Sequence, residues 1–259
     1  MSSKGILFLV SESKDLDYER LAQLASRFAR HYYDLPAEIV SINAKITGNR
    51  TFRWPDDNLQ TIQWNNYNRC FAFELSPYDE TLLLDVDFLV QSDTYKGYFD
   101  SNHDFLCYKT SWDISGNDVF RHNLYISPNK FEMRWATVVF FKKNEYTHNL
   151  FNTWLMVQQE WLYYSKLFGF TADPFRNDYA MSIAHQIVNG YSNVNTFKYS
   201  LPTLSSTDEI IDYNNKSWLV KYKLDDSYNV LKYKGDLHVM NKKCLLEKKL
   251  FNKLWDSVE

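Results

Sequence analysis

Apolar positions at the N-terminus form two short runs with a helical stripe between them. Residues 5–10 are almost entirely apolar and lead into a polar segment, which predicts a buried strand followed by a loop. Over residues 21–32 the apolar side chains recur at intervals of three and four, as in a helix that packs on one face. Pro36 ends this helix, and residues 37–42 read as a second strand. A strand, a helix and a strand in this order predict a right-handed crossover in a mainly parallel sheet flanked by helices.

The middle of the chain continues the alternation of strands and helices. We expect strands over residues 82–85, 105–108 and 136–141, and helices over residues 65–75 and 179–188. The spacing of apolar residues from Leu150 to Trp161 predicts one long amphipathic helix that begins after a cap at Asn144. The segment 169–176 reads as a loop.

The C-terminal third predicts a hairpin, a further strand and a lysine-rich helix. Residues 218–231 alternate around a polar turn at 225–227, and residues 236–240 form another apolar run. The side of the last helix that we expect to face inward carries Leu245, Leu246, Leu250 and Leu254. No internal repeat or low-complexity linker divides the chain, and we predict one α/β domain over residues 1–259.

The composition argues against several classes of protein. With a net charge of -3 and a pI near 6.1, the 259 residues carry no overall attraction for nucleic acid or anionic membranes. Three widely spaced cysteines fit neither a disulfide framework nor a zinc site, and we expect reduced thiols in a cytoplasm. We find no apolar segment long enough for a signal peptide core or a membrane span. The sequence also lacks a Gly-rich phosphate loop, so a nucleotide would need another binding device.

Two aspartates close the most apolar strand of the chain. Asp85 and Asp87 stand one residue apart, directly after Leu82, Leu83 and Leu84. Ligands of α/β sheets bind beyond the carboxyl ends of the strands, and buried carboxylates require a cation or another charge partner. Oxygen ligands favour Mg²⁺ or Mn²⁺ over zinc. The alternative is a strand-end pair that caps the next helix or faces solvent.

These aspartates belong to a larger pattern. Arg69 precedes Asp85 by sixteen positions, the N-terminus reads as strand, loop and helix, and a late histidine, His238, lies near a strand. The pattern resembles the GT-A glycosyltransferases. Within them it is similar to the family 8 type and to a group of bacteriophage proteins that share the lead Ser-Pro-Tyr-Asp-Glu-Thr, here residues 76–81. The resemblance implies one Rossmann-like GT-A domain, with a nucleotide-binding half over residues 1–100 and an acceptor-side half over residues 101–259.

The resemblance also implies a donor and a cofactor. The chain would transfer a sugar from a nucleoside-diphosphate sugar, with a UDP-sugar as donor and retention at the anomeric carbon. Mn²⁺ or Mg²⁺ would bind to Asp85, Asp87 and His238 and stabilise the leaving diphosphate. The acceptor stays open between a glycan, a protein, a lipid-linked sugar and a modified DNA base, in the cytoplasm of a bacterium or of a phage-infected cell.

Further residues match the donor site of these enzymes. The residues at the matching positions are Val10, Ser11, Glu12, Tyr18, Arg69, Val86 and Lys242. Arg69 would reach the donor beside the metal, and its alternative is a charge on a helix surface. The lysine that contacts the phosphates would be Lys242 or Lys243, although the glycine that precedes it in the family is missing here.

A candidate catalytic carboxylate follows the loop 169–176. Asp178, with Asn177 before it, resembles the family's Asp-Gln pair at a helix start, although Tyr179 replaces the glutamine. It would touch the donor sugar, steady an oxocarbenium-like state or orient the acceptor. Asp178, Asn177 and Arg69 are therefore the candidate catalytic residues. The alternative for Asn177 and Asp178 is a helix cap. Residues 134–137 also lack the family's Asn-x-Gly.

Two other functions fit parts of the pattern. A non-catalytic binding module can keep the same fold, because fold alone does not fix function. Haloacid-dehalogenase-like phosphatases also place Asp-x-Asp after an apolar strand. In that family, however, the motif lies near the N-terminus and continues with Thr or Val where Leu89 stands here. Metal-dependent hydrolysis of a nucleotide sugar would separate the enzyme from the binding module.

Overall fold

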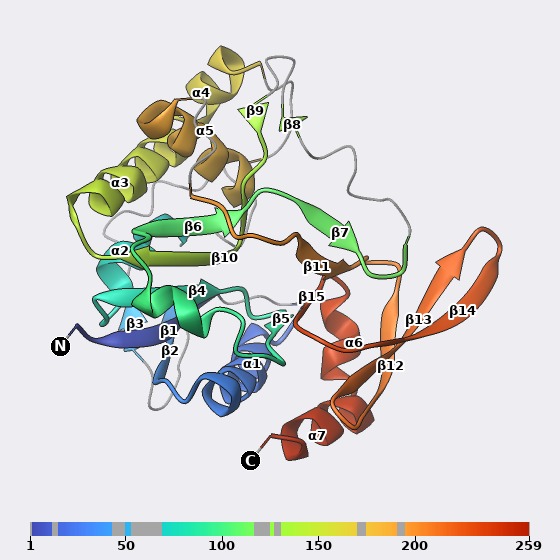
Figure 1. The fold of residues 1–259 in the computed structure, drawn as a ribbon. Helices are drawn as coiled ribbons and strands as arrows, with labels where there is room; N and C mark the ends of the chain where they lie inside the picture. The colour runs from blue at the N-terminus through green and yellow to red at the C-terminus, as the bar shows by residue number, and fades with distance from the viewer. Residues whose placement is uncertain are drawn as a thin grey trace.

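The computed structural model describes residues 2–11, 15–42, 50–52, 69–116, 125–126, 131–169, 175–190 and 195–258. In this part of the chain a six-stranded central sheet is joined to a four-stranded sheet and to a three-stranded sheet near the C-terminus (Figure 1). The strands of the central sheet, in spatial order, are β3 (Arg50–Phe52), β2 (Ala37–Ile42), β1 (Lys4–Ser11), β4 (Glu80–Leu84), β10 (Trp135–Lys142) and β6 (Phe105–Tyr108).

The central sheet is parallel on its N-terminal side and antiparallel at its other edge. Strand β1 pairs in parallel with β2 and β4, and β2 pairs in parallel with β3. Strand β10 runs antiparallel to both β4 and β6. The strands predicted over residues 5–10, 37–42, 82–85, 105–108 and 136–141 are all present. The predicted α/β class with a mainly parallel sheet flanked by helices is thus confirmed.

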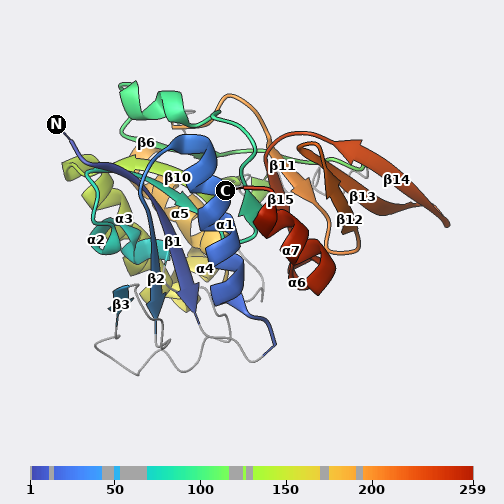
Figure 2. The same cartoon turned by 90° about the horizontal axis from the view of Figure 1, so that it is seen from below.

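Helix α1 (Tyr18–Tyr33) packs on β1 and β2 and separates the central sheet from the C-terminal part of the chain (Figure 2). It begins where the Asp17 carboxylate accepts a hydrogen bond from the Arg20 backbone N–H at 2.9 Å. The predicted apolar stripe is buried, except that Tyr32 is only half-buried and Tyr33 takes the core position. On the far side of the helix, Phe28 stacks on Trp218 with ring centres 6.0 Å apart.

The remaining helices up to residue 190 differ in length from those that the apolar pattern predicts. They are η2 (Arg69–Phe71), α2 (Ala72–Leu75), η3 (Lys96–Asp100), α3 (Glu145–Gln159), α4 (Trp161–Leu167) and α5 (Asn177–Asn189). The helix predicted over residues 65–75 is a 3-10 turn followed by a single α-helical turn, and residues 65–68 lie outside the described chain. Asn144 caps α3 as predicted, but the helix ends at Glu160, where ψ is 34°. Trp161 is the first residue of a second helix, and it is buried.

The start of α5 differs from the prediction. Arg176 occupies the N-cap position, and the helix has no side-chain cap hydrogen bond. Asn177 and Asp178 are already helical residues, so their interpretation as a cap is wrong. Most of the predicted loop before α5, residues 170–174, lies outside the described chain.

Within the described residues, the chain beyond β4 forms three smaller sheets. The four-stranded sheet contains, in spatial order, β5 (Phe88–Leu89), β15 (Leu237–Val239), β11 (Leu201–Leu204) and β7 (Ser111–Asp113). The three-stranded sheet contains β12 (Glu209–Asn214), β13 (Ser217–Leu224) and β14 (Ser227–Tyr233), and a short pair joins β8 (Tyr125–Ile126) to β9 (Phe131–Glu132). The predicted hairpin is β13 and β14. Strand β12 adds a third strand that the sequence pattern does not reveal.

The lysine-rich C-terminus forms two helices instead of one. Helix α6 (Lys242–Leu246) and helix α7 (Lys248–Asp256) are separated at Glu247, whose ψ of 120° is not helical. Leu245, Leu250 and Leu254 face the core as predicted, while Leu246 is only half-buried. The three cysteines are buried, and none of them is in a disulfide. Among the helices of the described residues, none has the length and hydrophobicity required to cross a membrane.

Gly5 marks a close contact between β1 and the segment that leads into β4. A Cβ atom at Gly5 would lie 2.3 Å from the ring of Tyr78, far inside van der Waals contact. The Tyr78 ring therefore occupies the place of a side chain at position 5, and it covers β1 where β1 pairs with β4. The chain needs glycine here for close packing of a ring on the backbone.

Candidate functional site

The two aspartates lie on a tight turn between the central sheet and the four-stranded sheet. Strand β4 ends at Leu84, and the Phe88 N–H donates to the Asp85 carbonyl at 3.0 Å to close the turn. The Asp85 N–H donates to the Thr137 carbonyl of β10 at 2.9 Å, which fixes the first aspartate to the central sheet. The Asp87 carbonyl accepts from the Val239 N–H at 2.8 Å, which fixes the second aspartate to β15. The local sequence thus places one carboxylate on each sheet.

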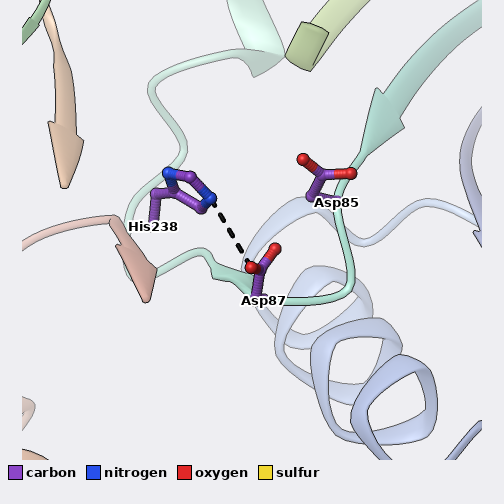
Figure 3. A group of neighbouring side chains, drawn as sticks. All are labelled: Asp85, Asp87 and His238. Carbon is purple, nitrogen blue, oxygen red and sulfur yellow. Dashed lines mark ion pairs between the residues drawn. The ribbon is translucent and has the colours of Figure 1, made fainter. Parts of the chain in front are cut away.

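Three side chains of this region surround a common space (Figure 3). Asp85, Asp87 and His238 each offer one ligand atom, and these atoms all lie within 4.8 Å of one another. His238 comes from β15, where it pairs with Phe88, and its Nε2 lies 3.5 Å from Asp87 Oδ2. The two carboxylates suit Mn²⁺ and Mg²⁺ alike, and the imidazole favours a transition-metal ion such as Mn²⁺ over Mg²⁺. The donor set therefore fits a divalent cation.

Each aspartate also has a cationic partner. Arg69 is 4% exposed and its guanidinium lies 2.6 Å from Asp85 Oδ1. A second bond from Arg69 to the Thr137 carbonyl spans 3.2 Å. On the other side, Lys242 Nζ lies 2.5 Å from Asp87 Oδ2. The interpretation of Arg69 as a surface helix charge is therefore wrong, since the residue is buried beside the aspartate turn.

Burial and neighbouring charge separate the two carboxyl groups electrostatically. Burial raises the pKa of Asp85, and the Arg69 guanidinium offsets this only in part, so the pKa lies above its ordinary value. Burial also acts on Asp87, but the Lys242 ammonium and His238 outweigh it and hold the pKa of that carboxyl well below its usual range. Burial lowers the pKa of Lys242, and Asp87 more than offsets it and raises the pKa above its ordinary value. Asp87 is thus firmly a carboxylate at neutral pH.

A cavity of about 320 Å³ opens over this turn and collects most of the residues singled out from the sequence. Its lining includes Ser11, Tyr18, Arg69, Asp85, Val86, Asp87, Asn177, Asp178, His238 and Lys242. Val10 is buried in β1 and does not line the cavity, and Glu12 lies outside the described residues. Lys243 is exposed and lines a different depression, so of the two candidate lysines only Lys242 reaches the site. The other depressions on α1 and α7, of about 430 and 520 Å³, bring together no such set of buried charges.

Asp178 approaches the site from the first turn of α5. Its Oδ1 accepts from the Ala136 N–H at 2.8 Å, and its Oδ2 accepts from the Arg176 guanidinium at 3.0 Å. Asn177 beside it is buried and also lines the cavity. A carboxylate at a helix N-terminus is favoured by the helix dipole. The structure therefore brings Asp178 into the same cavity as the aspartate turn, although it is fixed there by its neighbours rather than by capping.

Several residues of the site carry no recognisable signal in the sequence. Trp135, Phe175 and Met240 line the cavity as apolar walls. Thr203 lies behind His238, since β11 and β15 pair at these two residues and the Thr203 hydroxyl is 3.5 Å from His238 Nδ1. The Thr203 hydroxyl thus lies on the Nδ1 side of the ring, while Nε2 faces Asp87. Only the pairing of distant strands reveals Thr203.

Comparison with known proteins shows the fold. No protein family and no curated sequence matches the chain. The crystal structure of an active-site mutant of LgtC matches it with a TM-score of 0.51 and 12% identity, over 98% of this chain and 96% of LgtC. The chain has the fold of LgtC. The mixed sheet flanked by helices is thus one that LgtC also has.

Other solved structures resemble the chain less completely. A second LgtC structure, a galactosyltransferase in complex with donor and acceptor sugar analogs, has a TM-score of 0.44 and 14% identity over 74% of this chain and 72% of LgtC. The glycosyltransferase GlyE of Streptococcus pneumoniae TIGR4 has a TM-score of 0.42 and 12% identity over 76% of this chain and 45% of GlyE. The chain thus spans less than half the length of GlyE. The narrower resemblance to family 8 and to bacteriophage proteins stays a prediction.

Proposed function

We propose that this protein is a metal-dependent glycosyltransferase that uses a nucleoside-diphosphate sugar, with a UDP-sugar as the first donor to test. The observation that carries the proposal is the meeting of Asp85, Asp87 and His238 in one cavity with Asp178 and Lys242. The shared fold of LgtC supports it. The alternative is a binding module of the same fold that holds the nucleotide without reaction.

In this proposal Asp85, Asp87 and His238 hold Mn²⁺ or Mg²⁺, which supplies Lewis-acid stabilisation of the diphosphate leaving group. Arg69 acts as the fixed counter-ion of Asp85 and holds that carboxylate at its place. Lys242 carries the positive charge that contacts the diphosphate. Division into a nucleotide-binding half and an acceptor-side half belongs to the same proposal.

The donor lies, on this proposal, between the aspartate turn and the start of α5. Ser11 and Tyr18 line the side of the cavity where the nucleoside would sit, and Tyr18 offers a ring for the base. Asp178 would accept hydrogen bonds from hydroxyls of the donor sugar. Both of its oxygens already accept a bond, which favours a positioning and charge-stabilising role over a free nucleophile. If the reaction retains the anomeric configuration, it therefore does so without a covalent bond between the donor sugar and Asp178.

The first experiment is thermal unfolding with a panel of nucleoside diphosphates and nucleotide sugars, each with and without Mn²⁺. A ligand that binds only the folded protein raises the unfolding midpoint. At a ligand concentration a hundred times the dissociation constant, the free energy of unfolding rises by about 2.7 kcal/mol. We expect a rise that requires both the metal and a uridine nucleotide. The variant Asp85→Asn should lose this rise, and its own midpoint should fall, because the change leaves the buried Arg69 guanidinium without its carboxylate partner.

Hydrolysis of the nucleotide sugar separates the enzyme from the binding module. We expect slow metal-dependent release of free sugar from a UDP-sugar, followed by NMR, because water replaces the acceptor in such sites. Binding without any hydrolysis or transfer would favour the binding module. The absence of a midpoint shift with every pair of metal and nucleotide would contradict the proposed function itself.

A further inference from the structure

The aspartate turn is already electrically balanced without a metal. Asp85 is paired with Arg69 and Asp87 is paired with Lys242, so the charges of two carboxylates and two cations cancel. The surroundings are largely buried, with Asp87 only 1% exposed. A divalent ion that entered alone would leave a net double positive charge in this place, and a diphosphate that entered alone would leave a net negative one. Both are costly next to side chains that are largely buried.

The two cations differ in how firmly they are held. Arg69 is buried and makes a second bond to the Thr137 carbonyl, so its guanidinium is fixed on two sides. The Lys242 side chain is 28% exposed and faces the cavity, and among the described residues its one ion pair is with Asp87. A lysine carries its charge on a flexible stem, whereas the planar arginine fork holds a fixed geometry. Of the two cations, Lys242 is the one that can leave its carboxylate at the lower cost.

Lys242 also occupies the place that a metal would need. Its Nζ lies 2.5 Å from Asp87 Oδ2, and His238 Nε2 lies 3.5 Å from the same oxygen. An ion that shared Asp87 Oδ2 with His238 would therefore meet the ammonium group at close range. Two cations on one carboxylate oxygen repel each other strongly in a buried site.

We propose that Lys242 is the resident counter-ion of Asp87 and that it moves to the diphosphate when metal and nucleotide enter together. The inference rests on the proposed function and adds a mechanism of coupling to it. Without nucleotide, Lys242 competes with the metal for Asp87, and the protein binds Mn²⁺ weakly. With nucleotide, the diphosphate draws the ammonium away and frees Asp87. By linkage, the metal must then tighten nucleotide binding by the same factor.

The test is a titration with Mn²⁺ followed by the EPR signal of the free ion, with and without UDP. Three proteins are compared: wild type, Lys242→Met and Lys243→Met. Methionine keeps much of the length of the lysine stem and removes the charge. Lys243 is the matched control, since it is the adjacent lysine but is exposed and lines a separate depression. Circular dichroism and the unfolding midpoint establish that each variant is folded.

We expect Lys242→Met to bind Mn²⁺ about tenfold more tightly than wild type in the absence of UDP, because the competing charge is gone. In the same variant, the tightening of Mn²⁺ binding by UDP should fall to a small fraction of that in wild type. Lys243→Met should match wild type within about twofold in both conditions, as distant exposed charges are screened.

Three outcomes would overturn the inference. If wild type binds Mn²⁺ with UDP but Lys242→Met binds it no more tightly without UDP, Lys242 does not compete with the metal, and the proposed function stands. If Lys243→Met tightens Mn²⁺ binding as much as Lys242→Met, the effect is one of general charge. A wild-type protein that binds no Mn²⁺ with any nucleotide would overturn both the exchange and the proposed function.

Discussion

Asp85 and Asp87 are neighbours in sequence but belong to two different regions of the molecule. Asp85 is attached to the central sheet through Thr137 and is partnered by a buried arginine. Asp87 is attached to the four-stranded sheet through Val239 and is partnered by a lysine that reaches the cavity. The pKa of Asp85 lies above its ordinary value and the pKa of Asp87 lies below it. The difference shows that one motif contains a carboxylate whose counter-ion is buried and fixed and a carboxylate whose counter-ion reaches the cavity.

The largest effect should come from Asp87→Asn. This change removes the carboxylate that His238 and Lys242 share, and we expect metal-dependent nucleotide affinity to fall at least about a thousandfold, or roughly 4 kcal/mol. Isothermal titration of Mn²⁺ and UDP together measures the loss. Asp93→Asn, at an exposed position before η3, should bind as wild type does. Unchanged affinity in Asp87→Asn would remove Asp87 from the metal site.

Breaking the pair of Arg69 and Asp85 should lower the stability of the fold, whereas Asp87→Asn acts on nucleotide affinity. Arg69→Met leaves the Asp85 carboxylate without its counter-ion, and we expect the free energy of unfolding to fall by about 2 kcal/mol, less than for a fully buried pair because Asp85 keeps some exposure. Urea denaturation measures this fall. The same change at the exposed Lys4–Asp100 pair, Lys4→Met, should leave the unfolding midpoint unchanged. Equal stability of Arg69→Met and wild type would show that the pair contributes nothing to the fold.

His238→Ala tests the imidazole on the side of Asp87. We expect Mn²⁺ to bind roughly tenfold more weakly in the presence of UDP, with the unfolding midpoint of the ligand-free protein little changed. His148→Ala, on the exposed side of α3, serves as the control and should have no effect. Intact metal affinity in His238→Ala would make this histidine a residue of the core only.

Acid titration of stability should distinguish the two aspartates by sign. Because the pKa of Asp87 is lowered in the folded protein, this residue stabilises the fold at pH values above its pKa in the unfolded chain, about 3.9. That stabilisation is lost as the pH falls below this value. The raised pKa of Asp85 acts in the opposite sense, since the folded protein takes up a proton first and gains stability as the pH falls. We therefore expect the free energy of unfolding, measured with urea from pH 7 to pH 3, to fall less with decreasing pH in Asp87→Asn than in wild type. In Asp85→Asn the decline should steepen, and a change of the same sign in both variants would contradict the comparison.

The smallest effect should come from the residue behind His238. Thr203→Val keeps the shape of the side chain and removes the hydroxyl next to Nδ1. Because that contact is long, at 3.5 Å, we expect Mn²⁺ affinity with UDP to fall only about threefold. A fall as large as that of His238→Ala would mean that Thr203 fixes the imidazole almost alone. No change would show that the ring is held by packing.

The parts of the fold predicted correctly are those where one local signal decides the outcome. The apolar runs predict β1 and β4 because both strands are buried along their length. The helical stripe predicts α1 because this helix buries one face. The two long helices predicted near Trp161 and in the C-terminus fail for one reason. At Glu160 and Glu247 the backbone leaves the helical conformation, but the spacing of apolar residues continues across both positions. The spacing therefore cannot reveal where the helix ends.

The candidate site divides in the same way. Asp85 and Asp87 follow from a strand end, and His238 and Arg69 follow from the family pattern. The burial of Arg69 beside Asp85, the contact of Lys242 with Asp87 and the place of Thr203 depend on segments far apart in the chain. Spacing along one segment carries no information on such pairings. The metal, donor and catalytic roles of these residues remain predictions.

The close packing of Tyr78 on Gly5 has a consequence in evolutionary terms. Any side chain at position 5 would force the half-buried Tyr78 ring away from β1, so we expect a larger residue at position 5 to be accompanied by a smaller one at position 78. Tyr78 is part of the Ser-Pro-Tyr lead into the aspartate strand. In relatives of this protein, substitutions at these two positions should covary, and the tyrosine of that lead is then explained by the shape of β1 rather than by chemistry at the site.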